Sequence, residues 1–125
     1  MKTLAIVCQI VVGLSVLDVW LLRYRKPTRW RGGSATNMTE EFRYYGIPDW
    51  LRILTGITKV LLAGLLIAGV WYTPVTVPAA AMMSLLMGVA VWMHIRVKDS
   101  WMKSLPAFTM LLLSAIVVIV MKTPS

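Results

Sequence analysis

The chain has 125 residues, a mean hydropathy of +0.74 and a net charge of +8, and 58% of its residues are hydrophobic. Only 14% are charged, whereas soluble domains average about 25%. This composition excludes an ordinary water-soluble domain and predicts an integral membrane protein, with the lipid bilayer as its main partner.

Four apolar stretches are long enough to cross a bilayer, which takes about 20 mostly apolar residues. We expect spans at residues 3–22, 51–71, 75–95 and 105–121. Backbone polar groups in lipid must bond within their own segment, so each span should be an α-helix. The fold prediction is an all-α, four-helix transmembrane bundle, a single domain over residues 1–125, with a short interfacial helix between helices 1 and 2.

The first span contains the single cysteine, Cys8, so no internal disulfide is possible. The stretch "LAIVCQ" weakly resembles a lipoprotein cleavage box, but the apolar part before Cys8 is too short for a signal peptide. Apolar character continues through Leu22 with no A-x-A cleavage site after it. We therefore expect an uncleaved span.

The connection between the first two spans changes character along its length. "RYRKPTRWRGGSAT" is basic and contains proline and a glycine pair, which predicts a loop. "NMTEEFRYYG" predicts a short helix over about 38–45, with Asn37 as its cap and Glu40 in a capping-box-like position. Gly46 should end this helix, and Pro48 prevents its continuation. We expect it to lie along the membrane surface or against the mouth of the bundle, with Phe42 and Tyr45 on one side.

The second and third spans are joined by the short turn "YTPVT", so they should be antiparallel neighbours. Pro78 and Pro106 are expected in the first turns of the third and fourth helices, where a missing N–H costs little. Small residues allow close helix contacts in lipid, and we interpret them as internal contacts rather than a dimer face. They are Gly56, Gly64, Ala68 and Gly69 in the second span and Ala80, Ser84 and Gly88 in the third. Methionines 82, 83, 87 and 93 are interpreted as packing residues rather than haem or copper ligands.

Aromatic residues cluster near the expected ends of the spans, as membrane anchors do. Trp71 and Tyr72 mark the outer interface. The inner interface is marked by Trp20, Tyr24, Trp50, Trp92 and Trp101.

The basic residues are distributed unevenly, and this sets the expected orientation. Only Lys2 and Lys122 flank the outer side, and Lys59 lies within a span. The other ten of the 13 lie in two connections: Arg23, Arg25, Lys26, Arg29, Arg31, Arg43 and Arg52 in the first, and Arg96, Lys98 and Lys103 between spans three and four. This positive-inside pattern predicts a bacterial inner (plasma) membrane protein with both basic loops cytoplasmic and both termini outside. Anionic lipid head groups are the expected partners of the charge, and no nucleic acid is expected.

Two charged residues lie inside spans, where charges are functional suspects. Asp18 is expected about 6 Å, and Lys59 about 12 Å, from the cytoplasmic ends of their helices at 1.5 Å per residue. The two could form an ion pair that fixes helix register, or line a polar pocket for a head group, quinone or small anion. They could also snorkel independently to water.

The remaining polar residues near the same end could complete a ligand-binding mouth. The sole histidine, His94, cannot build a haem or zinc site alone. The predicted mouth consists of Asp18, Tyr24, Tyr44, Tyr45, Arg52, Lys59 and His94. No catalytic residue, metal site or intrinsic cofactor is expected, and a quinone is a candidate ligand.

Several short motifs follow one another in a distinctive order. They are "TRWRGG" in the first loop, "EEF", "YGIPDW", "GITK" in the second span, Pro78, "MH" at the end of the third span, and "KDSWMKSLPA". Over nearly the whole chain this order resembles the DoxX-like membrane proteins. The resemblance implies a small four-helix protein of mainly bacterial distribution.

The resemblance also implies functional alternatives. Some members of the family are associated with thiosulfate–quinone oxidation or oxidative-stress complexes, and more distant relatives with assembly or trafficking. Many members carry Glu three residues after the glycine of the second helix, where this chain has Lys59, so a role of that Glu is not carried over.

The leading hypothesis is a non-catalytic subunit or accessory of a membrane redox or stress-response assembly, with a protein partner. The alternative is a binding or transport module for a quinone, lipid or small amphiphile at the cytoplasmic mouth. Direct enzymatic activity is the third.

Overall fold

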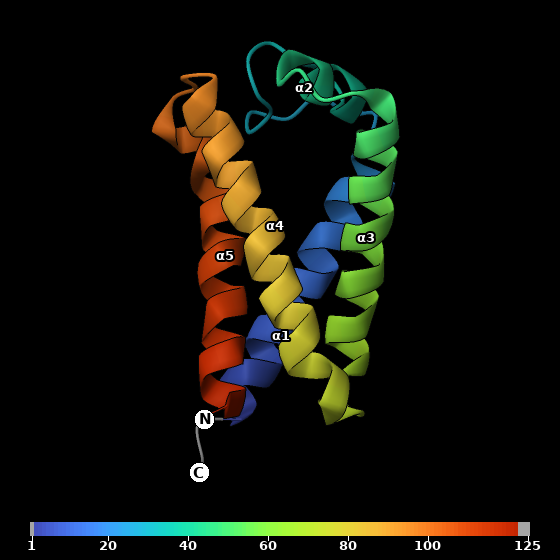
Figure 1. Cartoon of the computed structure of the whole chain (residues 1–125), viewed down its shortest axis with the longest axis vertical. Helices are drawn as coiled ribbons and strands as arrows, with labels where there is room; N and C mark the ends of the chain where they lie inside the picture. Colours follow the sequence, from blue (N-terminus) through green and yellow to red (C-terminus); the bar gives the residue numbers. More distant parts are fainter. Residues whose placement is uncertain (1, 123–125) are drawn as a thin grey trace.

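A computed structural model describes residues 2–122 of the chain and shows an all-α bundle (Figure 1). Four helical segments in it are long and apolar enough to span a membrane, which confirms the predicted fold class. In chain order the elements are α1 (Lys2–Leu17), the π-helical η1 (Asp18–Leu22), α2 (Met38–Tyr44), α3 (Asp49–Ala68), the 3₁₀ turn η2 (Thr73–Val75), α4 (Thr76–Arg96) and α5 (Trp101–Lys122).

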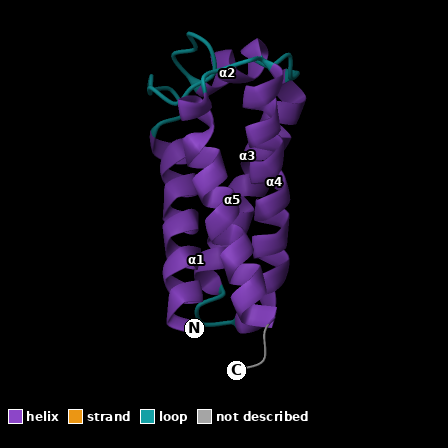
Figure 2. Ribbon diagram, turned by 90° about the vertical axis from the view of Figure 1, so that its left-hand side faces the viewer, coloured by secondary structure: helices purple, strands orange, loops and turns teal. Residues whose placement is uncertain are grey.

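The four long helices pack in a ring. Helix α1 contacts α3 and α5, and α4 contacts the same two helices, most closely α5. Helix α1 begins and α5 ends at the end opposite to α2 (Figures 1 and 2). We call the connection between η1 and α3, residues 23–48, the cap. It lies across one end of the bundle (Figure 2).

The start and end of α2 follow from its sequence. The Asn37 side chain accepts a hydrogen bond from the Glu40 N–H at 2.8 Å, which confirms the predicted N-cap. Gly46 has φ +80° and ends the helix, as predicted. The amides of Gly46 and Ile47 bond back to the carbonyls of Arg43 and Phe42, the arrangement of a Schellman motif.

The Glu40 side chain bonds to Thr36, one residue before the position to which a capping box would direct it. Its carboxylate accepts bonds from the backbone and side chain of Thr36, at 2.8 and 2.6 Å, rather than from the Asn37 N–H. The pKa of Glu40 is lowered, first by the Thr36 hydroxyl and then by the Thr36 amide. The loop before α2 and the first turn of α2 are therefore tied together.

Two prolines differ in their positions. Pro78 is the third residue of α4, which confirms its expected place in the first turn. Helix α5 begins at Trp101, so Pro106 lies inside it, and the first-turn prediction is wrong. The first turn of the helix lies before Pro106, where the Lys103 amide donates to the Ser100 carbonyl at 3.0 Å.

Close helix approach occurs at some of the predicted small residues and not at others. A Cβ on Gly56 would lie 2.6 Å from the Trp20 ring, and one on Gly69 would lie 2.3 Å from the Thr76 hydroxyl. Cβ atoms on Gly64 and Gly88 would meet nothing within 4 Å, so the expectation of internal contacts is wrong for these two. The α1–α3 contact depends instead on Gly13, where a Cβ would come within 2.7 Å of an isoleucine side chain of α3.

The exposure of the aromatic residues separates anchors from core. The side chains of Trp50, Tyr72, Trp71, Trp92 and Trp101 are all exposed, as lipid-facing anchors require. Trp20 is only 9% exposed and packs against Phe42 of α2 at 5.6 Å between ring centroids. The anchor prediction is therefore wrong for Trp20, which is a core residue beneath the cap.

Candidate functional site: a polar cap above a buried lysine

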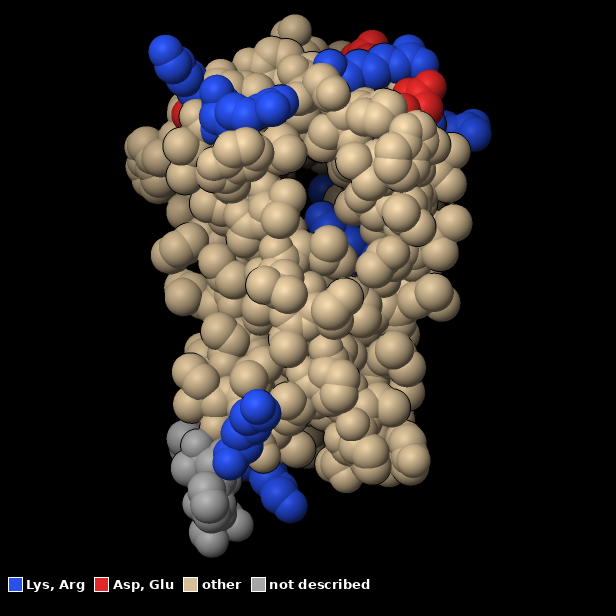
Figure 3. All heavy atoms as spheres, in the orientation of Figure 1, with Lys and Arg blue, Asp and Glu red and all other residues tan. Residues whose placement is uncertain are grey.

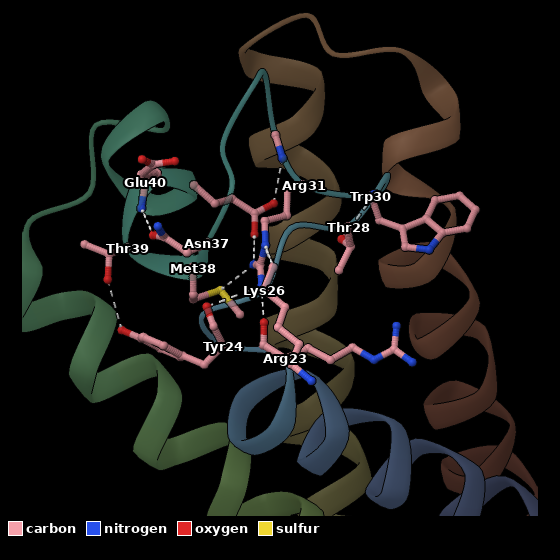
Figure 4. A network of polar contacts seen from close by, with 12 residues as sticks. Arg23, Tyr24, Lys26, Thr28, Trp30, Arg31, Asn37, Met38, Thr39 and Glu40 are labelled. Carbon is pink, nitrogen blue, oxygen red and sulfur yellow. Dashed lines mark hydrogen bonds and ion pairs between the residues drawn. The ribbon is translucent and has the colours of Figure 1, made fainter.

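Arg31 organises the cap loop from within. Its side chain is 4% exposed and donates from Nε to the Lys26 carbonyl at 2.9 Å and from Nη2 to the carbonyls of Arg23 and Tyr24. Figure 4 shows Arg31 at the centre of the loop, where a further contact reaches the Met38 sulfur at 3.7 Å. One buried guanidinium thus joins three loop carbonyls, of which those of Arg23 and Tyr24 also accept from the amides of Lys26 and Met38.

The charge of Arg31 is balanced by Glu41 of α2. Arg31 Nη1 donates to Glu41 Oε1 at 3.2 Å, and both side chains are buried. Glu41 Oε2 accepts two more bonds, from the Gly32 amide at 2.7 Å and the Tyr45 hydroxyl at 3.0 Å. A buried ion pair costs little only when its remaining hydrogen-bonding positions are filled, as they are here.

Tyr45 continues this network to α4 and to the turn after it. Its hydroxyl lies 3.2 Å from His94 Nε2, and His94 Nδ1 lies 2.9 Å from Asp99 Oδ2. Burial, followed by the nearby Glu41 carboxylate, raises the pKa of Tyr45, so its hydroxyl keeps its proton. The Gly33 amide donates to Asp99 Oδ1 at 3.1 Å, which connects Asp99 to the cap loop.

These contacts form one continuous chain of polar side chains. It runs from Arg31 through Glu41, Tyr45 and His94 to Asp99, and we call it the cap network.

Lys59 of α3 lies below the cap and is buried, with 8% of its surface exposed. Its ammonium lies 5.8 Å from the centre of the Trp20 ring, a cation–π contact. Within residues 2–122 no hydrogen bond or ion pair to this ammonium is formed. Leaving a lysine unpaired deep in a bilayer costs roughly 2.5–3.5 kcal/mol, so this position needs a reason.

The side of the bundle has a hollow below the cap. Figure 3 shows a hollow in the face between α3 and α4, below the cap, with Lys or Arg atoms visible inside it. The other basic residues lie in the cap or near helix ends, whereas Lys59 is the eleventh residue of α3. Around the hollow this face is otherwise uncharged, so it has a basic interior below the cap, which is where the position of Lys59 in α3 places that residue.

The predicted mouth residues separate into groups. Tyr45 and His94 are in direct contact, as the ring prediction requires. Tyr44 is exposed and lies beside the Tyr45 ring, 5.9 Å away between centroids. The Asp18–Lys59 ion pair, one of the alternatives that the sequence left open, is not formed, because Asp18 pairs with Arg23 at 3.0 Å at the surface of the π-helical turn.

Tyr24 and Arg52 form a second polar group outside the cap network. Arg52 donates to the Tyr24 hydroxyl at 2.7 Å and to Asp49 at 2.6 Å. They face an open depression of about 610 Å³. Its lining is Tyr24, Arg25, Asn37, Thr39, Glu40, Arg43 and Arg52.

Sequence reasoning missed three members of the cap network: Arg31, Glu41 and Asp99. One signal was available for Glu41, which lies four residues before Tyr45 and so on the same side of a helix. Arg31 was counted only as one of many loop charges. Within the described part of the chain, no group of three or more His, Cys, Asp or Glu side chains could hold a metal ion.

The fold and the apolar surface define a multi-pass α-helical membrane protein. The cap network lies at one end of it, above Lys59. The model of the DoxX-like family matches residues 32–119, and the chain belongs to this family. Comparisons with curated proteins and with solved structures gave no match.

Proposed function

We propose that this protein binds the polar head of a membrane-dissolved amphiphile, such as a quinone or lipid, beneath the cap. The observation that carries the proposal is Lys59, a buried ammonium with the Trp20 ring beside it and with no acceptor among residues 2–122. A ligand oxygen would supply the missing acceptor. The hollow beside this level supports the proposal, because it provides access from the side of the bundle (Figure 3).

The arrangement favours binding over catalysis. The groups of the cap network already bond to one another, from Arg31 through Glu41, Tyr45 and His94 to Asp99. Such a network fixes the position of a lid and leaves Lys59 as the group available to a ligand. The head of the ligand would be held below the cap while its tail stays in an apolar environment.

Purification in a mild detergent, followed by mass spectrometry of the extracted lipids and quinones, tests this function. We expect the wild-type protein to retain an amphiphile that the Lys59→Met variant loses. The Lys122→Met variant is the matched control, since it removes the same charge from the exposed end of α5. Equal retention by both variants, or a wild-type protein that carries no amphiphile above the detergent background, would contradict the proposal.

We further propose that the cap faces the cytoplasm in a bacterial inner membrane and that both termini face outward. The support is the charge distribution, with ten of the 13 basic residues at the cap end. Trypsin should cleave the cap in inverted membrane vesicles and leave it intact in spheroplasts. The reverse pattern would overturn this orientation.

The second candidate function is that of a non-catalytic subunit or accessory in a membrane redox or stress-response assembly. Gly64 and Gly88 favour it, because a Cβ at either would meet nothing and another helix could approach there. Co-purification after cross-linking in native membranes tests it. A partner lost in a Gly64→Leu variant and retained in a Leu61→Ala variant would support the assembly, whereas a protein that cross-links to nothing would count against it.

A further inference from the structure

We infer that the head group bound below the cap is anionic, a carboxylate or a phosphate ester, and that it enters from the bilayer between α3 and α4. This inference rests on the proposed function and names its ligand class. It follows from the charges of the chain itself, from the burial of Lys59 and from the position of the hollow.

The chain has five acidic side chains, and within residues 2–122 none of them forms an ion pair with Lys59. Glu41 accepts from Arg31, Gly32 and Tyr45, and Asp99 accepts from His94 and Gly33. The other three bond at the surface: Asp18 with Arg23, Glu40 with Thr36, and Asp49 with Arg43 and Arg52. The charge of Glu41 reaches Lys59, but Glu41 is already paired with Arg31, and no side-chain carboxylate within residues 2–122 forms an ion pair with Lys59.

A neutral ligand would leave this imbalance in place. A quinone carbonyl can accept a hydrogen bond from Lys59, but it brings no negative charge into the bundle. A carboxylate or phosphate oxygen supplies both the acceptor and the counter-charge, and hydrogen bonds between two ionised groups are the stronger kind. The unpaired ammonium thus selects for an anion.

The route of entry is set by the cap. Above Lys59, the contacts of Tyr45 with Glu41 and His94 and of Gly33 with Asp99 join α2, the cap loop, α4 and the turn after it. The visible opening is lateral, in the face between α3 and α4 (Figure 3). Around the opening this face shows no other charged side chains (Figure 3), and the helices that border it, α3 and α4, expose apolar side chains such as Ile57 and Val89, at 54% and 52%. The ligand is therefore an amphiphile whose chain lies against lipid, and not a free anion from water.

Displacement of radiolabelled oleate from the purified protein in a neutral detergent tests the inference. Unlabelled oleate and oleyl phosphate should both compete, and their relative strengths distinguish a carboxylate from a phosphate head. Methyl oleate, with the same chain and no charge, should compete at least about tenfold more weakly, as expected when a charged hydrogen bond is lost. Inorganic phosphate should not compete, because it has no chain.

The variants make the result specific to the site. Lys59→Met should abolish the preference for oleate over methyl oleate, Lys59→Arg should keep it, and Lys122→Met should leave it unchanged. Equal competition by oleate and methyl oleate would overturn the anionic head group while leaving the proposed binding function intact. Competition by inorganic phosphate as strong as that by oleate would overturn lateral entry. If no labelled oleate binds and the purified protein carries no amphiphile, the inference and the proposed function fail together.

Discussion

Replacing Glu41 by Gln should loosen the cap without changing the bundle below it. The wild-type carboxylate accepts three hydrogen bonds, from Arg31 Nη1 at 3.2 Å, the Gly32 amide at 2.7 Å and the Tyr45 hydroxyl at 3.0 Å. Gln has one acceptor oxygen, and its amide group would face at least one of these donors. It also leaves the 4% exposed Arg31 side chain without its counter-charge.

The size of the effect follows from the state of Arg31 after the change. Removing one partner of a buried ion pair costs about 3–5 kcal/mol when the other charge is left uncompensated. Arg31 keeps its bonds to the carbonyls of Arg23 and Lys26, so we expect the lower limit, about 3 kcal/mol. That corresponds to an increase of roughly 100-fold in the population of the opened cap.

Hydrogen exchange of the cap amides measures this opening directly. The Gly32 amide should exchange roughly 100-fold faster in Glu41→Gln, while amides in the middle of α5 stay unchanged. Glu40→Gln is the matched control, because it removes the same charge from the neighbouring, exposed position. The double variant Arg31→Met with Glu41→Gln should recover part of the loss, because it also removes the uncompensated charge. Exchange in Glu41→Gln no faster than in Glu40→Gln would refute this account of the cap.

Two further predictions concern helix packing and pH. Gly56→Ala should destabilise the bundle by about 1–3 kcal/mol, because the new methyl group would lie 2.6 Å from the Trp20 ring. Gly64→Ala, with nothing within 4 Å, should be neutral or slightly stabilising in the same thermal unfolding measurement, and equal losses in both variants would contradict the packing described here. The lowered pKa of Glu40 means that its contribution to α2 is fully present above its ordinary pKa of 4.5 and is lost as the pH falls through the lowered value. Hydrogen exchange of the Thr36 amide, corrected for intrinsic rates, should therefore become faster in acid in the wild-type protein and should not depend on pH in Glu40→Gln. A wild-type exchange rate that does not depend on pH would contradict this prediction.

The helices could be predicted because lipid imposes simple rules on the sequence. Long apolar runs have one satisfactory backbone conformation in a bilayer, so four of them predict four helices. The ends of α2 were equally readable, because Asn37 and Gly46 act through bonds to residues at most four positions away. Pro106 was misplaced because helix boundaries depend on a single turn, here the bond from Lys103 to Ser100.

The candidate site was harder to predict because its contacts join distant parts of the chain. Tyr45 and His94 were both expected at the mouth, but nothing in the sequence indicates that Asp99 bonds to Gly33, 66 positions away, or that Arg31 turns inward. Of the alternatives for Asp18 and Lys59, the ion pair is not formed, because Asp18 in the π-helical turn pairs with Arg23. The charged residues of one loop look equivalent in the sequence, and only the fold shows which of them become buried.

The cap also has a consequence for the biogenesis of the protein. The bond between Tyr45 and His94 joins residues 49 positions apart, that between Gly33 and Asp99 joins residues 66 apart, and that between Lys103 and the Gly33 carbonyl joins residues 70 apart. While the ribosome has delivered only the first three long helices, His94 is present but Asp99 and Lys103, the partners of Gly33 in the cap, are not. The cap can therefore close fully only after synthesis has passed residue 103, so protease should cleave the cap of a nascent polypeptide stalled before that point faster than the cap of the finished chain.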